Sequence, residues 1–443
     1  MAVVRCLVPD GPGATGEPAL SRGYAWGMLP QIPDSMATTA KKWAMRVVLA
    51  FLAVQTAVVG FLVIFDAIKH RQRKTRPNFP HPGVFQGPVA DSEVTIYTYG
   101  EDLYAAMLDA IRGAKTRIFM ETYIWKSDDT GLQFKNALND AAARGVEVFV
   151  VYDGFANLVV SPSFFKFHPK IHVHRFPVMR PSRVFSPLRS TGLDHRKLLI
   201  VDDETGFVGG YNIGELYATE WRDTHVRITG PSVWDLRQTF AIVWNAVGGA
   251  PEIPHHSPHT WDLHIRTVNN IPALLVYPIR GLYLDVINRA SSHIYITTAY
   301  FIPDQQILQA LLAASKRGVD VRLIMPENSN HVLADWLSRG FYTTLLREGV
   351  TVLRYRNAMI HAKTATIDGR WSTVGTANID RLSLTGNYET NLEIHDRTFA
   401  ENMENIFDID SGNCTELTLA DWQKRYVAAR ISETLLRPLR PLL

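Results

Sequence analysis

The alternation of apolar and polar positions predicts helices and strands that follow one another through most of the chain. From Leu108, "LDAIRGAKTRIFMETYIW" begins with the spacing of an amphipathic helix and ends in a strand pattern rich in β-branched and aromatic residues. The next helix is predicted to end at Gly145, and another strand begins within "RGVEV". Alternating elements of this kind predict a mixed or parallel sheet that is covered by helices.

The same order of elements occurs a second time. "LDVINRASSHIYITTAYF" from Leu284 is similar to the stretch at Leu108, and "RGVDV" from Arg317 is similar to "RGVEV". A repeat of this length predicts two similar domains rather than a solenoid, whose repeats are shorter. We therefore expect a first domain at residues 93–246, a linker rich in Gly, Pro and His at 247–270, a second domain at 271–410 and a C-terminal helical extension at 411–443.

The N-terminal region has a different pattern. Residues 1–43 are predicted to be disordered, with Met36 as an alternative start. Val47 to Phe65 contain no charged residue and as a helix would measure about 28 Å, close to the roughly 30 Å of a bilayer core. A transmembrane helix within 44–67 is therefore favoured over a signal peptide or a buried helix. A basic, Pro-rich linker at 68–92 follows, and its charges favour a catalytic part on the cytoplasmic face.

Composition narrows the possible functions. The chain has 443 residues, is 46% hydrophobic and carries a formal net charge of +3, which is too small to indicate nucleic-acid binding over such a length. Cys6 and Cys414 are the only cysteines, so neither a disulfide framework nor a cysteine metal cluster is expected.

The strongest chemical signal is a motif that each half contains once. "HRKLLIVDDETGFVGGYN" begins at His195, and "HAKTATIDGRWSTVGTAN" begins at His361. A His-x-Lys-x4-Asp match arises by chance at about one position in ten thousand, so two matches with equivalent downstream residues are not a coincidence. The paired positions are His195 and His361, Lys197 and Lys363, Asp202 and Asp368, Asn212 and Asn378, and Asp223 and Glu389.

The spacing within each motif predicts which side chains point to the same face of the strand. Side chains alternate along a strand, so His195 and Lys197 share one face while Asp202 points to the other, and the second motif has the same parity. Asp202 and Asp368 complete the motifs and are counted with the candidate catalytic residues, but we expect them to bond groups near a turn. Asp223 and Glu389 are the better candidates to orient the imidazoles.

These residue types suit a phosphodiester substrate. The lysines can neutralise its oxygens, and the amides of Asn212 and Asn378 can donate hydrogen bonds to them in the transition state. One neutral imidazole can attack phosphorus, and a second, protonated one can donate to the leaving alkoxide. The sequence therefore predicts a phosphoryl-transfer site in which a pseudo-twofold axis joins two half-sites, and which needs no metal or cofactor.

Further stretches extend the signal to a family resemblance. With "WRDTHVRITGP" at Trp221, "YFIPD" at Tyr300 and "NYETNLEIHD" at Asn387, the doubled motif resembles the phospholipase D superfamily and, within it, bacterial cardiolipin synthases, over about residues 90 to 410. Gly210 and Thr376 depart from the serine that often follows the motif glycine.

The resemblance implies a fold, a reaction and roles. It implies two phospholipase D-like α-β-α sandwich domains with the site at their interface. It also implies a membrane phosphatidyltransferase that joins two phosphatidylglycerol molecules into cardiolipin, releases glycerol and passes through a phosphatidyl-histidine. His195 would be the nucleophile, and His361 the general acid and then the base.

Three other functions stay open. A lipid hydrolase that forms phosphatidic acid is the closest, a nuclease is disfavoured by the apolar span and the low charge, and a degenerate binding protein is disfavoured because both motifs are intact. Other residues have less specific interpretations. His255, His256 and His259 are expected in a solvated linker. Glu121, Tyr123 and Tyr300 end core strands, where they either line the pocket or simply pack. Trp422 and Tyr426 belong to an amphipathic helix that could dock on the core or on the bilayer, with docking on the core favoured.

Overall fold

A computed structural model describes residues 41–43, 45–46, 49–50, 53–58, 60, 78–177, 192–254 and 262–442. Much of the expected span Val47–Phe65, and the histidines at 255, 256 and 259, lie outside these residues. Within the described part of the chain no helix is both long and apolar enough to cross a bilayer. All elements below belong to the unit Ala57–Leu443.

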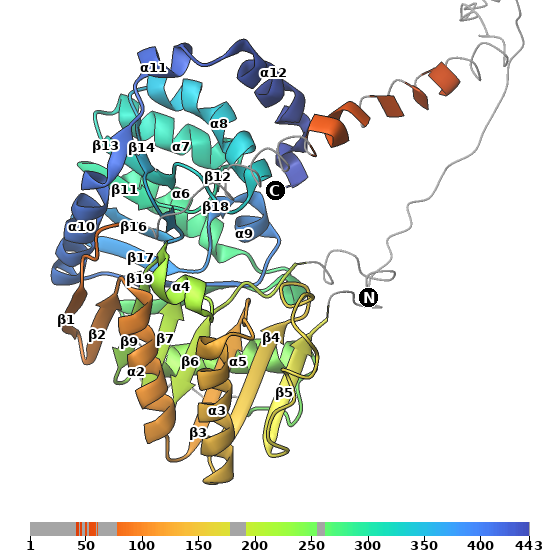
Figure 1. Ribbon diagram of the computed structural model, residues 1–443. Helices are drawn as coiled ribbons and strands as arrows, with labels where there is room; N and C mark the ends of the chain where they lie inside the picture. The colour runs from red at the N-terminus through yellow and green to blue at the C-terminus, as the bar shows by residue number, and fades with distance from the viewer. Residues whose placement is uncertain are drawn as a thin grey trace, which may run out of the picture. The chain divides into compact units, whose positions relative to one another are not determined.

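The first half is an eight-stranded mixed sheet with helices on both faces (Figure 1). Its strand order is β1 (Val84–Val89), β2 (Ser92–Tyr97), β9 (His225–Thr229), β7 (Thr205–Gly209), β6 (Leu198–Val201), β3 (Arg117–Thr122), β4 (Glu147–Asp153) and β5 (Ile171–Phe176). Strands β3, β4 and β5 are parallel, and the other pairs are antiparallel. Apolar residues of α2 (Gly100–Gly113) and α3 (Asp129–Ala143) pack on one face, and those of α5 (Val233–Ala246) pack on the other.

The second half repeats this topology. Its strand order is β10 (Ile265–Asn270), β19 (Glu389–Ile394), β17 (Trp371–Gly375), β16 (Thr364–Ile367), β11 (His293–Thr297), β13 (Asp320–Pro326), β14 (Thr351–Tyr355) and β20 (Cys414–Glu416). The order from β10 to β14 matches the order from β2 to β5. One face is covered by α6 (Pro278–Arg289), α7 (Gln305–Lys316) and α8 (Val332–Arg347), and the other by α10 (Arg397–Gly412). The prediction of two similar mixed α/β halves is confirmed.

Local sequence explains where equivalent helices begin and end. The side chain of Asp128 accepts a hydrogen bond from the backbone N–H of Gly131 at the start of α3, and Asp304 does the same for two N–H groups at the start of α7. After these helices, Gly145 and Gly318 have φ angles of 96° and 89°, which side chains with a Cβ rarely adopt. Both glycines therefore end the helices where the sequence predicts.

Three segments contain more structure than the sequence predicts. β1 lies in the expected linker 68–92, and β10 lies in the expected linker 247–270. Both are edge strands with polar residues or Pro and Gly among the apolar ones, so their apolar pattern is weak. The extension 411–443 contains β20 before its helices α11 (Leu419–Gln423), α12 (Val427–Leu436) and η4 (Arg437–Leu442). Its Trp422 is buried in the core of the second half, whereas Tyr426 is exposed.

One core cluster crosses from half to half. It joins α5 and the first sheet to Val374, Leu392 and Ile394 of the second sheet and to α10. Arg222, which is fully buried, also donates two hydrogen bonds to Asp410 of α10, at 3.0 and 2.7 Å. The two halves are thus packed into a single unit, which fixes the segments that carry the motifs.

Candidate active site

The backbone places each motif histidine beside the opposite half. His195 and His361 lie just before β6 and β16. The N–H of His195 donates to the carbonyl oxygen of Tyr388 at 3.1 Å, and the N–H of His361 donates to that of Arg222 at 2.7 Å. Two short parallel strands, β8 (Trp221–Arg222) and β15 (Met359–Ile360), extend the second of these contacts.

As a result, the histidines and their carboxylates pair crosswise between the halves. Nδ1 of His195 lies 3.1 and 3.0 Å from the carboxylate oxygens of Glu389, and Nδ1 of His361 lies 2.6 Å from Oδ2 of Asp223. The structure therefore brings Asp223 and Glu389 to the imidazoles, each to the histidine of the other half. Since Nδ1 is occupied in both rings, Nε2 is the atom available to a substrate.

The two pairs differ in their electrostatics. Burial raises the pKa of Glu389 to about 8 and lowers that of His195. At Asp223 burial acts in the same direction, but His361 and Lys363 outweigh it and hold the pKa of the carboxyl below its usual value. The Asp223 carboxylate is therefore ionised at neutral pH, whereas the His195–Glu389 pair retains a proton.

The motif lysines are buried behind the histidines. Nζ of Lys197 donates to the carbonyl oxygen of His195 at 2.5 Å, and Nζ of Lys363 donates to that of His361. Burial lowers their pKa values to about 8 and about 7. Neither lysine is among the residues that line the cavity, so their charge acts on a substrate from behind the imidazoles.

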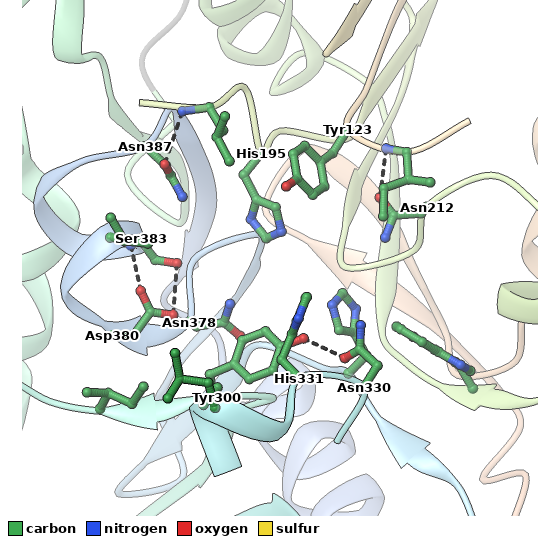
Figure 2. Close-up of a pocket in the computed structure, with 18 residues that line it drawn as sticks. Tyr123, His195, Asn212, Tyr300, Asn330, His331, Asn378, Asp380, Ser383 and Asn387 are labelled. Carbon is green, nitrogen blue, oxygen red and sulfur yellow. Dashed lines mark hydrogen bonds between the residues drawn. The ribbon is translucent and has the colours of Figure 1, made fainter. Parts of the chain in front are cut away.

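A cavity of about 280 Å³ lies between the two half-sites (Figure 2). His195, His361, Asn212 and Asn378 all line it. Oδ1 of Asn212 accepts from the N–H of Ile124 at 3.2 Å, which leaves its amide nitrogen for a ligand. Tyr123 lies with its ring centre 4.8 Å from that of His195. The cavity thus combines two imidazoles with amide donors, as a phosphodiester site requires.

The motif aspartates, which complete the two motifs, do not line the cavity. Asp202 and Asp368 follow β6 and β16, so a whole strand separates each from its motif histidine. Asp202 accepts from the N–H groups of residues 115, 116 and 117 at 2.8–3.1 Å, and Asp368 does the same with residues 291, 292 and 293. The alternation of side chains along the strand is the physical reason. These carboxylates fix the turns that precede β3 and β11.

Two departures from the usual motif have a structural explanation. A Cβ at Gly210 would lie 2.0 Å from Oδ1 of Asp223, so only glycine fits beside this carboxylate. At the equivalent position, the hydroxyl of Thr376 donates to Oε2 of Glu389. The residue after the motif glycine thus either makes room for the carboxylate or holds it.

Sequence reasoning missed several residues of the cavity wall. Trp221 lies with its ring centre 5.0 Å from that of His361. Tyr123 and Tyr300, by contrast, were candidates for the pocket wall and do line the cavity, whereas Glu121, the third candidate, is buried against Arg196. Tyr300 also donates to Oδ1 of Asn330 at 2.6 Å. The sequence signal that could have identified the missed residues is their distance along the chain from the motifs. The further wall residues are Asn330, His331, Asp380, Ser383 and Asn387.

Comparisons with known proteins identify the family to which the two motif-bearing segments belong. The family model described as "Cardiolipin synthase, PLD-like domain" matches residues 107–244 and 283–410. A cardiolipin synthase of Clostridium perfringens is 32% identical over 369 residues, 80% of this chain and 77% of that protein. The major cardiolipin synthase ClsA of Bacillus subtilis (strain 168) is 34% identical over 366 residues, 80% of this chain and 76% of that protein.

A solved structure shares the fold. The phosphatidylserine synthase of Haemophilus influenzae Rd KW20 is similar with a TM-score of 0.61 at 14% identity, over 79% of this chain and 93% of that chain. Each of the two segments that the family model matches contains one complete motif. The chain therefore belongs to the phospholipase D superfamily, within the cardiolipin synthase family with PLD-like domains, and is an enzyme of the phosphatidyltransferase type.

Proposed function

We propose that this protein makes cardiolipin from two phosphatidylglycerol molecules and releases glycerol. The observation that supports this most directly is the pair of imidazoles that line one cavity. Each half supplies one imidazole, and each imidazole pairs with a carboxylate of the other half. The relatives in Clostridium perfringens and Bacillus subtilis, which are named cardiolipin synthases, support cardiolipin as the product, and the family resemblance implies phosphatidylglycerol as the substrate.

The reaction proceeds in two displacements at phosphorus. Nε2 of His195 attacks, the bond from phosphorus to the glycerol oxygen breaks, and the imidazolium of His361 gives its proton to that oxygen. The headgroup hydroxyl of a second phosphatidylglycerol then attacks the same phosphorus. His361 takes the hydroxyl proton, and the phosphorus–nitrogen bond breaks to free His195.

The other polar groups stabilise charge during these steps. Asp223 stabilises the imidazolium of His361, and Glu389 orients His195. The amides of Asn212 and Asn378 donate to the phosphate oxygens. Lys197 and Lys363 lower the energy of the negative charge that develops at phosphorus, although they are buried behind the histidines.

The bilayer is the proposed partner. A single span at Val47–Phe65 would hold the two halves where phospholipids are abundant, and the basic residues after it place the catalytic part on the cytoplasmic face. No nucleic acid is required, and the net charge of +3 does not favour it.

The test is the product balance. Purified enzyme with phosphatidylglycerol alone should yield cardiolipin and free glycerol in equal amounts, measured by lipid mass spectrometry and a glycerol assay. Formation of phosphatidic acid alone, whichever alcohol-bearing lipid is offered, would show that the enzyme is a hydrolase.

A further inference from the structure

The cavity is not symmetric, although the two halves that form it are. Counted from the motif histidines, the catalytic candidates occupy identical positions in both halves. Three polar residues of the second-half wall have a counterpart of different chemistry. Asp380, Ser383 and Asn387 correspond to Gly214, Tyr217 and Trp221 of the first half, of which Trp221 alone lines the cavity.

The first half presents one aromatic side chain, Trp221, where the second half presents polar residues. Trp221 packs edge-on against the buried Tyr217, with ring centres 4.9 Å apart, and lines the cavity beside His361. Gly214 has a φ angle of 155° and no side chain. This side contributes an apolar surface beyond the phosphate-binding amide of Asn212.

The second half presents polar atoms instead. Figure 2 shows Asp380, Ser383 and Asn387 on the side of the cavity opposite Asn212. The Asp380 side chain accepts from the N–H of Ser383 at 2.7 Å and so caps α9 (Arg381–Thr385). Oδ1 of Asn387 accepts from the N–H of Leu193 at 3.1 Å, and its amide nitrogen makes no hydrogen bond within the described residues.

One more acceptor on this side has no partner. Oδ1 of Asn378 is buried and makes no hydrogen bond to any described residue, whereas the equivalent oxygen of Asn212 accepts from Ile124. A buried acceptor without a partner is unfavourable, so a ligand that donates a hydrogen bond to this oxygen would be bound more tightly than one that does not. The bound group should therefore carry a donor.

The mixture of acceptors and a donor selects the kind of ligand. A phosphodiester has only acceptor oxygens, so the Asp380 carboxylate and Oδ1 of Asn378 do not suit it. A hydroxyl group both donates and accepts, and therefore matches Asp380, Asn378 and the amide nitrogen of Asn387 together. An ammonium group would leave the Asn387 donor without a partner.

The location fits the alcohol part of the substrate. Asp380 lines the same cavity as His361, which protonates the leaving oxygen in the proposed reaction. Burial raises the pKa of Asp380 to about 7, so this side chain is ionised above neutral pH. We infer that Asp380, Asn387 and Asn378 form a subsite for the free hydroxyls of the headgroup glycerol, both in the lipid that is cleaved and in the lipid that accepts. This inference deepens the proposed function, since it explains how one lipid headgroup is recognised in both roles.

The experiment compares two lipids with identical acyl chains. Phosphatidylglycerol and phosphatidylpropanol differ only in the two free hydroxyls, and the ratio of kcat/KM for their cleavage measures recognition of those hydroxyls. At pH 8, where the Asp380 carboxyl is mostly ionised, the ratio should fall about tenfold in Asp380→Ser, as expected for one hydrogen bond to a charged group. Serine is a good helix-capping residue, so α9 should keep its start. Thr385→Ala, on the exposed face of the same helix, should keep the wild-type ratio.

Other outcomes would overturn the inference. A ratio that is the same in Asp380→Ser and Thr385→Ala would show that Asp380 does not recognise the headgroup hydroxyls. If phosphatidylethanolamine is the preferred lipid and Asp380→Ser removes that preference, the subsite binds an amine. The ratio concerns cleavage, so it tests the subsite even if the wild-type enzyme forms only phosphatidic acid, the result that would refute the proposed function.

Discussion

At the scale of single residues, the two motif imidazoles differ in the carboxylate that holds each of them. Asp223 is ionised and accepts from His361 at 2.6 Å, which suits a ring that must carry a positive charge. Glu389 has a raised pKa, so the His195 pair carries an additional proton at pH 7. Burial lowers the pKa of His361 to about 3 even so, and the assignment of His195 as the nucleophile and His361 as the acid rests on the family resemblance.

The assignment leads to a prediction about the covalent intermediate. His195→Ala and His361→Ala should each abolish cardiolipin formation, but only His361→Ala retains the attacking nitrogen. Brief incubation with phosphatidylglycerol labelled in its acyl chains should therefore label His361→Ala and not His195→Ala, as seen after denaturation and gel separation at alkaline pH, where the phosphorus–nitrogen bond is stable. His264→Ala, which changes an exposed histidine, serves as the active control. Labelling of His195→Ala alone would reverse the roles.

The charge of Asp223 leads to a second prediction. Asp223→Asn keeps the shape but removes the charge that stabilises the His361 imidazolium, so kcat should fall by about 10²–10⁴. The measurement is the steady-state rate of glycerol release. Asp203→Asn changes a more exposed aspartate near the start of β7 and should have little effect. A loss of less than tenfold in Asp223→Asn would mean that His361 does not become charged during the reaction.

Glu389 leads to a prediction about pH. Nε2 of His195 can attack only after the His195–Glu389 pair has lost its proton, and burial raises the pKa of Glu389 to about 8. The value of kcat/KM should therefore show an acid limb that rises with pH as the pair loses its proton, because deprotonation activates the nucleophile. Loss of charge from Lys363 and Lys197, whose pKa values are about 7 and about 8, opposes this rise and should produce a falling limb at higher pH. In Glu389→Gln the amide oxygen accepts from Nδ1 and cannot titrate, so this acid limb should move to lower pH. The same limb in both enzymes would assign it to another group.

At the scale of elements, each motif strand has two different ends. The histidine end of β6 or β16 faces the cavity, and the aspartate end binds the turn that precedes β3 or β11. Both aspartates have positive φ angles, 56° and 54°, and accept several backbone N–H groups. The motif thus couples a reactive histidine to a fixed strand rather than placing three reactive groups together.

Substitution of the anchoring aspartate should accordingly affect stability more than catalysis. Asp202→Asn would weaken hydrogen bonds to three N–H groups and lower the free energy of unfolding by roughly 1–3 kcal/mol. The rate of the folded enzyme should change only a few-fold. Urea unfolding followed by an activity assay on the folded fraction separates the two effects. Complete loss of activity without loss of stability would contradict this role.

The sequence predicts these elements to different degrees. Regular periodicity identified the repeated helix–strand units, and strand parity correctly separated Asp202 from His195. The crossed pairing was not predictable, because the 28-residue spacing from histidine to carboxylate is the same in both halves and says nothing about which half each carboxylate faces. The edge strands β1 and β10 were missed because exposed edges need no continuous apolar pattern.

At the scale of the whole molecule, the two halves depend on each other for both core and site. A common apolar cluster and the buried Arg222–Asp410 pair join them. The carbonyl oxygen of Arg222 also receives the backbone N–H of His361. A substitution that weakens this contact between the halves should therefore also disturb the position of His361, even though no residue of the cavity is changed.

We expect Arg222→Met to lower the free energy of unfolding by about 3–5 kcal/mol, because it leaves the Asp410 carboxyl buried without its partner. Unfolding should remain one transition, seen at the same denaturant concentration by circular dichroism and tryptophan fluorescence. The double variant Arg222→Met, Asp410→Leu should recover part of the loss, because no unpaired acid remains. Two separate transitions in the wild-type protein would show that the halves unfold independently.

The crossed pairs also bear on how such a site can acquire a preference. Two identical copies of one half, associated as a homodimer, would already supply both histidines with a carboxylate from the neighbouring copy. In that dimer every substitution would appear twice, so a carboxylate placed at the position of Asp380 would also replace the glycine at the position of Gly214. Joining both copies in one chain removes this constraint. One wall can then stay aromatic while the other becomes polar, and a site with twofold chemistry can bind a substrate that has two different ends.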